Sequence, residues 1–356
     1  MDWTFLIFTL VKIAVVFAVV MTMVAYAVLV ERKVSAFIQD RVGPNRAAPF
    51  FARYIPFLGP RLVRWGIFQP VADALKAILK EDYTPAHVRK VYFWIAPAIA
   101  MVPALLTLAV IPFGSQIGSQ KMVIADLDVG ILYTFGIVSL GVYGIVLAGY
   151  AANSKYPFLG GIRSSAQMIS YEISMGLSVI PVFLLVGSLN LSDVIGNQSG
   201  SLLNWHVVKQ PLAFFIFLIA AFAETNRLPF DLPEAETELV GGYHTEYSSM
   251  KFALFFLGEY AAMISVSAMM VTLFLGGWTL PFLGLDQPAA TIGMGLVHIL
   301  IFLMKLCFLL LIIIWVRWML PRFRYDQLMD LGWRRFIPVA LANIILTAAV
   351  LAFVRS

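Results

Sequence analysis

The chain has 356 residues, of which 61% are hydrophobic and only 13% are charged. This composition excludes an ordinary soluble domain and predicts a membrane protein, because apolar runs of about 20 residues suffice to cross roughly 30 Å of hydrocarbon. The net charge of +5 says little by itself, and the single cysteine, Cys307, excludes a disulfide framework or a thiolate cluster within the chain.

The apolar runs predict an all-α polytopic membrane protein with one transmembrane domain over residues 1–356. We expect about eight membrane-spanning helices, at residues 4–30, 91–113, 131–152, 166–187, 209–225, 251–275, 295–319 and 336–354. We do not expect the first run to be a signal peptide. It is too long, it follows the acidic Asp2 rather than a basic region, and it ends in Glu31-Arg32-Lys33 without a small-residue cleavage site.

Basic residues gather in the loops on one side of these spans. That side carries eighteen Lys and Arg, eleven of them in the first loop, and comprises loops 31–90, 153–165, 226–250 and 320–335. The opposite side contains only Lys121, in loops 114–130, 188–208 and 276–294. By the positive-inside rule the basic loops are cytoplasmic, and both termini lie on the periplasmic side of a cell inner membrane.

The first cytoplasmic loop contains a second kind of helix, in the segment FQPVADALKAILKED. Apolar residues recur there at helical spacing, the polar residues Asp73, Lys76 and Lys80 fall on the other side, and Pro70 suits a first turn. With an aromatic flank before it, the segment predicts an amphipathic helix at the membrane surface. The alternative is an ordinary surface helix of a loop domain.

The fourth span carries an acid inside its apolar run. Glu172 lies about two turns into SSAQMISYEISMGLSVIP, beside Tyr171, with no basic residue within four positions. An ionised carboxylate is costly in such surroundings, so the neutral form is favoured and the group is suited to taking up and releasing protons. The alternative is a protonated carboxyl that only hydrogen-bonds a neighbouring helix.

The most acidic stretch runs from Glu224 to Glu259, between two apolar segments. Prolines after Arg227 and the pair Gly241-Gly242 interrupt it, so it is not one continuous helix. The inner acids of the stretch are Glu234, Glu236, Glu238 and Glu246, and the first three could be a solvated loop. Glu224 and Glu259 lie in apolar sequence, where charge is costly, and this favours a functional role.

Motifs of several other classes are absent from the sequence. It contains no GxGxxG after a strand, no GxxxxGK[ST], no HExxH and no CxxC. Its four histidines are far apart and none forms a haem-ligating pair on one span, so we expect no redox cofactor or metal to be held by this chain alone. Lys12, Lys305 and Arg317 are basic residues inside predicted spans that could pair with intramembrane acids, although Lys12 and Arg317 could also snorkel.

Two long stretches carry a resemblance to a known family. GIFQPVADALKAILKE (Gly66 to Glu81) and PFDLPEAETELVGG (Pro229 to Gly242) resemble signatures of the H subunit of NADH–quinone oxidoreductase, called subunit 1 in mitochondria. Supporting matches are ERK, DRVGPNR, QMISYEIS, FAETNR, FALFFLGEY and RFRYDQLMDLGW. The resemblance covers essentially the whole chain. One departure is the segment between Arg46 and Gly66, which is longer than the family's link.

The resemblance implies a membrane-arm subunit of proton-translocating respiratory complex I, not catalytic alone. Such a subunit forms the quinone chamber with its lipid-side entrance, for ubiquinone or menaquinone, and the first part of an acidic proton-coupling path. The residues that match the path are Glu172, Glu224, Glu234, Glu236, Glu238, Glu246 and Glu259. Those that match charged positions around the quinone cavity are Arg32, Arg41, Asp73, Lys76 and Arg227.

The resemblance also implies the partners: the peripheral-arm subunits of the quinone site, which with others carry FMN and iron–sulfur clusters, neighbouring small membrane subunits, quinone and the lipid bilayer, but no nucleic acid. One alternative is the corresponding subunit of a membrane-bound hydrogenase-type complex. Another is a stand-alone ion exchanger, although such proteins often show internal repeats and no self-similar halves are visible here.

Overall fold

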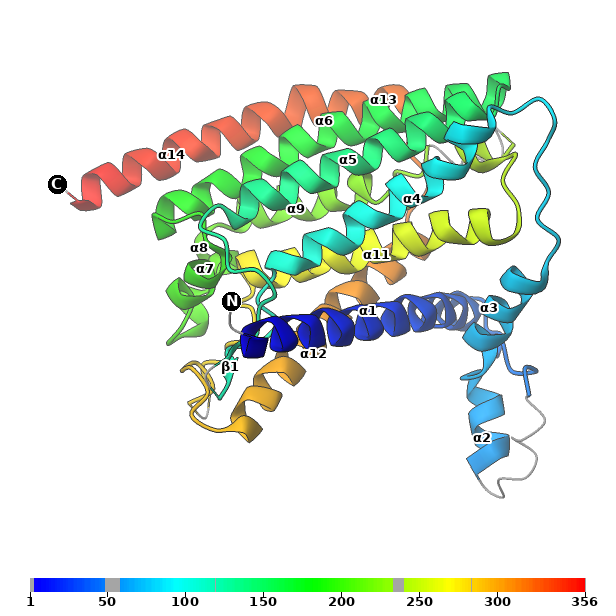
Figure 1. Ribbon diagram of the computed structural model, residues 1–356. Coiled ribbons are helices and arrows are strands. Elements are labelled where there is room, and N and C mark those ends of the chain that lie inside the picture. Colours follow the sequence, from blue (N-terminus) through cyan, green and yellow to red (C-terminus); the bar gives the residue numbers. More distant parts are fainter. Residues whose placement is uncertain (1–2, 49–57, 119, 233–239, 283, 356) are drawn as a thin grey trace.

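The computed structural model describes residues 3–48, 58–118, 120–232, 240–282 and 284–355. The long helices are α1 (Trp3–Ile38), α4 (Lys90–Leu106), α5 (Gly130–Ala151), α6 (Lys155–Val186), α9 (Pro211–Glu224), α11 (Ser249–Phe274), α12 (Ile292–Met319) and α14 (Ile337–Arg355). Figure 1 shows them as a bundle of roughly aligned helices, with both chain termini at the same end. The all-α class and the multi-pass architecture predicted from the sequence are confirmed.

Shorter elements connect the long helices. At the end of the bundle that carries the basic loops, the basic end, lie α2 (Leu58–Trp65), α3 (Gln69–Leu79), α13 (Tyr325–Asp330) and a π-helix, η5 (Leu331–Phe336). The other connecting elements are η2 (Thr107–Val110), the two-stranded hairpin β1 (Gln116–Ile117) and β2 (Gln120–Lys121), α7 (Leu191–Asn197), η3 (Leu202–Asn204), α8 (His206–Lys209) and η4 (Gly242–His244).

Seven of the described helical segments are long and apolar enough to cross a membrane. They include every predicted span except the fifth, since α9 has only 14 residues, fewer than the roughly 20 that a bilayer requires. Pro211 begins α9 and a turn at Thr225 ends it, which limits its length. The eight predicted spans are therefore seven long helices and one short helix.

Two spans extend beyond their predicted ends. Helix α6 begins at Lys155, 11 residues before its predicted start, and α1 continues to Ile38. Both extensions carry charged residues, such as Arg163 and Arg32, at the basic end of the bundle, where the helix leaves the apolar part of the chain. Hydropathy finds where an apolar run stops and not where the helical hydrogen bonds stop, so these extensions could not be seen in the sequence.

Helix α11 lies at the centre of the bundle. Eighteen of its residues are buried, and it contacts α1, α3, α4, α9 and α12. Small residues allow these contacts: a Cβ atom added to Gly258 would lie 3.2 Å from the Cα atom of Met101 on α4. Close approach of backbones at small residues is the usual mode of helix packing in membranes. The burial of α11 means that any polar group on it must find partners on neighbouring helices.

Helix α3 confirms the helix predicted from the 70–80 pattern. Pro70 occupies its first turn, and none of its side chains is buried. Leu75, Ile78 and Leu79 are all more than half exposed. Figure 1 shows α3 at the basic end of α1, set apart from the main body of the bundle. An amphipathic helix in this place suits the boundary between membrane and water.

Candidate functional site

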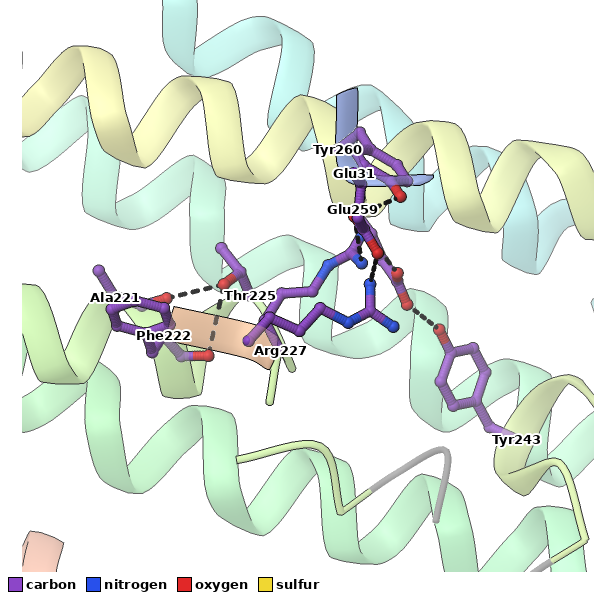
Figure 2. A network of polar contacts seen from close by, with 9 residues as sticks. Glu31, Ala221, Phe222, Thr225, Arg227, Tyr243, Glu259 and Tyr260 are labelled. Carbon is purple, nitrogen blue, oxygen red and sulfur yellow. Dashed lines mark hydrogen bonds and ion pairs between the residues drawn. The ribbon is translucent and has the colours of Figure 1, made fainter. Parts of the chain in front are cut away.

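The end of α9 positions two of the residues that the sequence singles out. Asn226 has a left-handed backbone (φ +50°), the N–H of Asn226 donates to the carbonyl of Ala223, and the N–H of Arg227 donates to that of Phe222. This pair of bonds is a Schellman cap, which ends a helix and turns the chain sharply. The Thr225 hydroxyl also lies 2.9 Å from the carbonyl oxygen of Ala221 (Figure 2). The cap leaves Glu224 as the last helical residue and directs Arg227 away from α9.

Arg227 lies between two carboxylates from different helices. Its Nη1 is 3.4 Å from Oε2 of Glu31 on α1, and its Nη2 is 3.5 Å from Oε2 of Glu259 on α11. The guanidinium also stacks over the Tyr260 ring, 4.2 Å from its centroid. Figure 2 shows these groups converging from separate helices. Arg227 and Glu31 are less than 10% exposed, so the charges interact with little screening.

Glu31 has further partners. Arg317 on α12 forms an ion pair with Oε1 of Glu31, and the Tyr260 hydroxyl donates to Oε2 over 2.7 Å. We call Glu31, Arg227, Glu259, Tyr260 and Arg317 the arginine cluster. Within it two carboxylates lie against two guanidinium groups, and buried ions are tolerated when they contact groups of opposite charge. Arg317 therefore partners an intramembrane acid, one of the two roles that the sequence left open.

Glu224 is in a different situation. It is 4% exposed, and neither carboxylate oxygen has a hydrogen-bond partner among the described residues. It is also the last residue of α9, at the helix end whose dipole disfavours a negative charge. Electrostatic interaction couples it to Glu172 on α6, so ionisation of one opposes ionisation of the other. These three features distinguish Glu224 from the acids of the arginine cluster.

Glu224 borders an internal cavity of about 70 Å³, which we call the Glu224 cavity. Its walls come from α4, α5, α6, α9 and α11, and Glu259 and Tyr243 also line it. The Tyr243 hydroxyl lies 3.3 Å from Oε1 of Glu259. A cavity of this size has room for several water molecules, and the carboxyl groups supply polar partners for them. A proton on Glu224 therefore has space for an exchange partner.

Gln167 on α6 holds the chain after α9 in place. Its Nε2 donates to the carbonyls of Ala223 and Phe230 over 2.8 and 2.7 Å, and lies 3.3 Å from Oδ1 of Asn226. Gln167 is fully buried. The same helix carries Glu172, half-buried, less than two turns further on. The motifs QMISYEIS and FAETNR, far apart in sequence, thus form one packed unit.

A second, larger cavity of about 460 Å³ lies between α1, α3 and α11; we call it the α3 cavity. Its lining is mostly apolar, with Val24, Val28, Phe256 and Leu257 among the side chains. Charged groups also line it: Arg32 on α1, which pairs with Asp73 on α3 over 2.7 Å, and Lys76 and Lys80 from α3 and its end. An apolar cavity with a few charged groups suits an amphiphilic ligand with a long apolar tail.

The arginine cluster separates the two cavities. Glu259 lines the Glu224 cavity and its neighbour Tyr260 lines the α3 cavity, while Arg227 contacts both residues. A change of charge in the α3 cavity would therefore alter the electrostatic potential most at the arginine cluster and less at the Glu224 cavity. The distances of 3.4 and 3.5 Å from Arg227 to the carboxylates of Glu31 and Glu259 are longer than those of tight ion pairs.

Comparison with known proteins relates this arrangement to a family. A sequence profile described as NADH dehydrogenase matches residues 11–348. The NADH-quinone oxidoreductase H subunit 1 of Cytophaga hutchinsonii is 46% identical over 352 residues, 97% of each chain. The H subunit 2 of Geobacter sulfurreducens is 48% identical over 347 residues, 96% of each chain, and the H subunit of Flavobacterium psychrophilum is 47% identical over 355 residues, 98% of each chain. The chain belongs to this family of NADH dehydrogenase H subunits.

Several residues that the resemblance to these H subunits pointed to lie in the two cavities or between them. Glu224, Glu259 and Arg227 converge as described, and Arg32, Asp73 and Lys76 line the α3 cavity. Three residues lie elsewhere. Glu172, half-buried on α6, lines neither cavity. Glu246, just before α11, is 3.7 Å from His87, and Arg41 is exposed beyond the end of α1, beside Gln39. Glu234, Glu236 and Glu238 lie outside the described residues.

Sequence reasoning missed three members of the arginine cluster as site residues: Glu31, Tyr260 and Arg317. The sequence held a signal for each. Glu31 opens the ERK motif, Tyr260 ends FALFFLGEY, and Arg317 is a cation inside an apolar run. What the sequence lacked was the pairing, because Glu31 and Arg317 are separated by 286 positions. Only the packing of α1 against α12 brings them together.

Within the described part of the chain, no three His, Cys, Asp or Glu residues gather in a way that could hold a metal ion. His206 and His298 are both fully buried. The ring of His206 contacts the Leu273 carbonyl and the Asn197 side chain, and burial lowers the pKa of His206 to about 4, so it is neutral near pH 7. Its contacts give it a structural role at the end of α11.

Proposed function

We propose that this chain is the membrane-arm subunit of a proton-translocating NADH:quinone oxidoreductase. In this proposal the α3 cavity admits the quinone from the lipid, and the buried acids form the first part of a proton-coupling path. The observation that carries the proposal is the adjacency of the two cavities. The arginine cluster lies between the apolar α3 cavity and the Glu224 cavity, which is bordered by a buried acid without a hydrogen-bond partner among the described residues.

The α3 cavity fits the tail of a quinone. Its walls are apolar side chains of α1 and α11, and α3 forms the side that lies away from the bundle. Leu75, Ile78 and Leu79 on α3 are well exposed, as expected of a helix that rests on lipid. A long isoprenoid chain can pass between such surfaces without losing its apolar surroundings, while the polar head meets Arg32 and Lys76.

The cluster supplies the chemistry that quinone reduction needs from a chain without redox groups. Reduction to quinol takes two electrons and two protons, and the head becomes negatively charged before it is protonated. Electrons come from the FMN and iron–sulfur clusters that we assign to partner subunits. A developing negative charge would compete with Glu31 and Glu259 for the two arginines, and the resulting shift of Arg227 would change the electrostatic potential at Glu224.

The membrane position follows from the same proposal. The basic end of the bundle, with α3 and the loop around Glu246, would face the cytoplasm, where the peripheral-arm subunits bind. Both termini would lie on the periplasmic side of the inner membrane. The chain would not act as a catalyst alone. Purification of the intact complex tests this directly: a flavin subunit that oxidises NADH supports the proposal, and a nickel–iron hydrogenase subunit in its place contradicts it.

The assignment of the entrance is tested by Ala74→Trp and Asp73→Asn in the assembled complex. Ala74 lines the α3 cavity, so the bulky ring narrows the path, and the neutral amide weakens the tie between α3 and Arg32. We expect turnover with a long-tailed quinone to fall roughly tenfold for Ala74→Trp and less for Asp73→Asn, because the Arg32–Asp73 pair is partly exposed. NADH oxidation with a soluble electron acceptor should be unchanged.

The two activities separate the possible outcomes of this test. The soluble acceptor takes electrons before they reach quinone, so it reports whether the complex is assembled. Normal turnover with a long-tailed quinone in Ala74→Trp would contradict the assignment of the entrance to α3. Loss of both activities together would show failed assembly and would leave the entrance without support.

A further inference from the structure

Helix α3 is not held by its own hydrophobic packing. None of its side chains is buried, and the apolar ones face outward or into the α3 cavity. A helix of 11 residues is only marginally stable by itself in water. Its position relative to α11, and with it the width of the α3 cavity, must therefore depend on specific ties to neighbouring elements.

The tie near the middle of α3 is exposed. Asp73 pairs with Arg32 on α1 over 2.7 Å, and the two side chains are 35% and 48% exposed. Gln69, one turn earlier, lies 3.0 Å from the same carboxylate. Ion pairs at this level of exposure contribute little, because water and salt screen them. Different residues must therefore position the C-terminal end of α3.

Ser249, the first residue of α11, ties the end of α3. Its Oγ lies 3.0 Å from the carbonyl oxygen of Ala77 and 2.9 Å from that of Lys80. Carbonyls in the last turn of a helix have no partner within the helix, and the single O–H of Ser249 lies within reach of two of them and can donate to either. Ser249 is 7% exposed, has a left-handed backbone (φ +53°) and lines the α3 cavity.

Lys251 ties the segment that follows α3. Its side chain is 9% exposed, and Nζ lies 3.0 Å from Oδ2 of Asp82 and donates to the Thr84 hydroxyl over 2.9 Å. The ammonium also lies 4.0 Å from the centroid of the Trp94 ring on α4. Salt bridge, hydrogen bond and cation–π contact together hold one cation between three elements. Lys251 lies behind the wall and does not line the α3 cavity.

We propose that Lys251, supported by Ser249, is a positioning residue that fixes α3 against α11 and so sets the width of the path for a long quinone tail. The inference rests on the proposed function, since it gives the α3 cavity its occupant. Lys251 would act on substrate only through Asp82, Thr84 and the end of α3. A short-tailed quinone, which occupies less of this path, would depend on the residue less.

The structure favours Lys251→Met as the main variant. Methionine keeps an unbranched apolar side chain against Trp94, and Asp82 is 42% exposed, so water can solvate the carboxylate left behind. Asp82→Asn is a poorer choice because it leaves the buried ammonium without its counter-ion. Lys251→Arg is the matched control, since it keeps the charge. Ser249→Gly removes the hydroxyl and also the strained backbone of a non-glycine residue.

The experiment measures kcat and KM of the assembled complex with a quinone of many isoprene units and with a short-tailed analogue. In Lys251→Met we expect KM for the long-tailed quinone to rise roughly three- to tenfold at nearly constant kcat, and KM for the short-tailed one less than about twofold. In Lys251→Arg, KM for the long-tailed quinone should stay close to that of the unmodified chain. In Ser249→Gly it should rise, but by less than in Lys251→Met. NADH oxidation with a soluble acceptor should stay constant.

Two results would overturn the inference. One is that neither KM changes in Lys251→Met, and the other is that both KM values rise by the same factor, which would indicate a general defect. Ala74→Trp, measured beside it, distinguishes this failure from that of the proposed function. If Ala74→Trp slows turnover of the long-tailed quinone while Lys251→Met leaves its KM unchanged, the entrance assignment stands and the positioning role is wrong. If neither variant affects it, the entrance itself is wrong.

Discussion

The buried acids of this chain fall into two groups that the sequence could not tell apart. Glu31 and Glu259 are paired with arginine, whereas Glu224 has no hydrogen-bond partner among the described residues and interacts electrostatically with another acid, Glu172. Both groups lie in or beside apolar sequence and both are rich in motif matches. The paired acids lie against guanidinium groups, whereas Glu224 is the last residue of α9, where the helix dipole opposes a negative charge.

Burial alone therefore does not make an acid a proton carrier. A carboxylate held by two guanidinium groups gives up its charge only at a large cost, so its natural role is to hold and sense charge. A neutral carboxyl beside a cavity that can contain water is suited to exchanging protons. The arginine cluster and Glu224 would then be successive parts of one device, the first responding to quinone and the second moving a proton.

The largest effect should follow from breaking the paired group at its centre. Arg227→Met would leave Glu31 with only Arg317 and would remove the arginine between Glu31 and Glu259. Removing one partner from a buried ionic cluster costs about 3–5 kcal/mol, so we expect the complex to fail to accumulate in membranes. The measurement is the amount of assembled complex on native gels.

A second substitution tests whether charge balance is the cause. Glu259→Gln in the Arg227→Met background removes a carboxylate that has lost its contact with Arg227, so the double variant should assemble better than Arg227→Met alone. Arg227→Lys, which keeps the charge without the planar fork, should fall between Arg227→Met and the unmodified chain. If the double variant were no better than the single one, the loss would have to come from packing against Tyr260.

Substitution of Glu224 should leave assembly intact and cause a large loss of activity. Glu224→Gln is close in shape to the neutral acid, so the complex should assemble normally. Proton pumping, followed with a pH-sensitive dye in membrane vesicles, should fall by about 10²-fold or more, in line with the contribution of general acid–base groups. Glu224→Asp, which still ionises, should keep part of the activity.

Glu259→Gln provides the contrast between the two groups. There the loss of charge leaves Arg227 with one carboxylate fewer, so we expect less assembled complex, and the remainder should still pump. Proton pumping at the normal rate in Glu224→Gln would show that the proton path does not include this residue. Identical behaviour of Glu224→Gln and Glu259→Gln would abolish the distinction between paired and unpaired acids.

Much of the fold could be predicted because its signals are local. Apolar runs predicted the positions of the long helices, and the spacing from Pro70 to Leu79 predicted α3. The facing of the helices could not be predicted. Helices such as α11 and α12 are apolar on all sides, so periodicity does not show which residue meets which neighbour. The contact between Glu31 and Arg317 and the tie from Lys251 to Asp82 both depend on that facing.

The candidate site could likewise be predicted only where its signals are local. An acid inside an apolar run, such as Glu224, is visible in sequence, because the cost of burying it marks it. Whether it is paired depends on the next helix. The Schellman cap that directs Arg227 towards α1 and α11 needs a left-handed residue, and Asn226 is one of the residues that tolerate this conformation. That signal was present in FAETNR, but its consequence needed the neighbouring helices.

The smallest effect should follow from trimming the paired group without changing its charge. The Tyr260 hydroxyl donates to Glu31 over 2.7 Å, while the Tyr260 ring lies against Arg227. Tyr260→Phe keeps the ring and removes one hydrogen bond of roughly 1–2 kcal/mol, and Glu31 retains both arginines. We expect normal assembly and a change in quinone turnover below about threefold.

Tyr243→Phe, whose hydroxyl lies 3.3 Å from Glu259, is the matched variant on the other side of Arg227 and should change turnover less, because its bond is longer. Both reactions are measured as NADH oxidation with a long-tailed quinone. A large loss in Tyr260→Phe with normal assembly would mean that the hydroxyl itself handles a proton, and Glu31 would then belong with Glu224 rather than with Glu259.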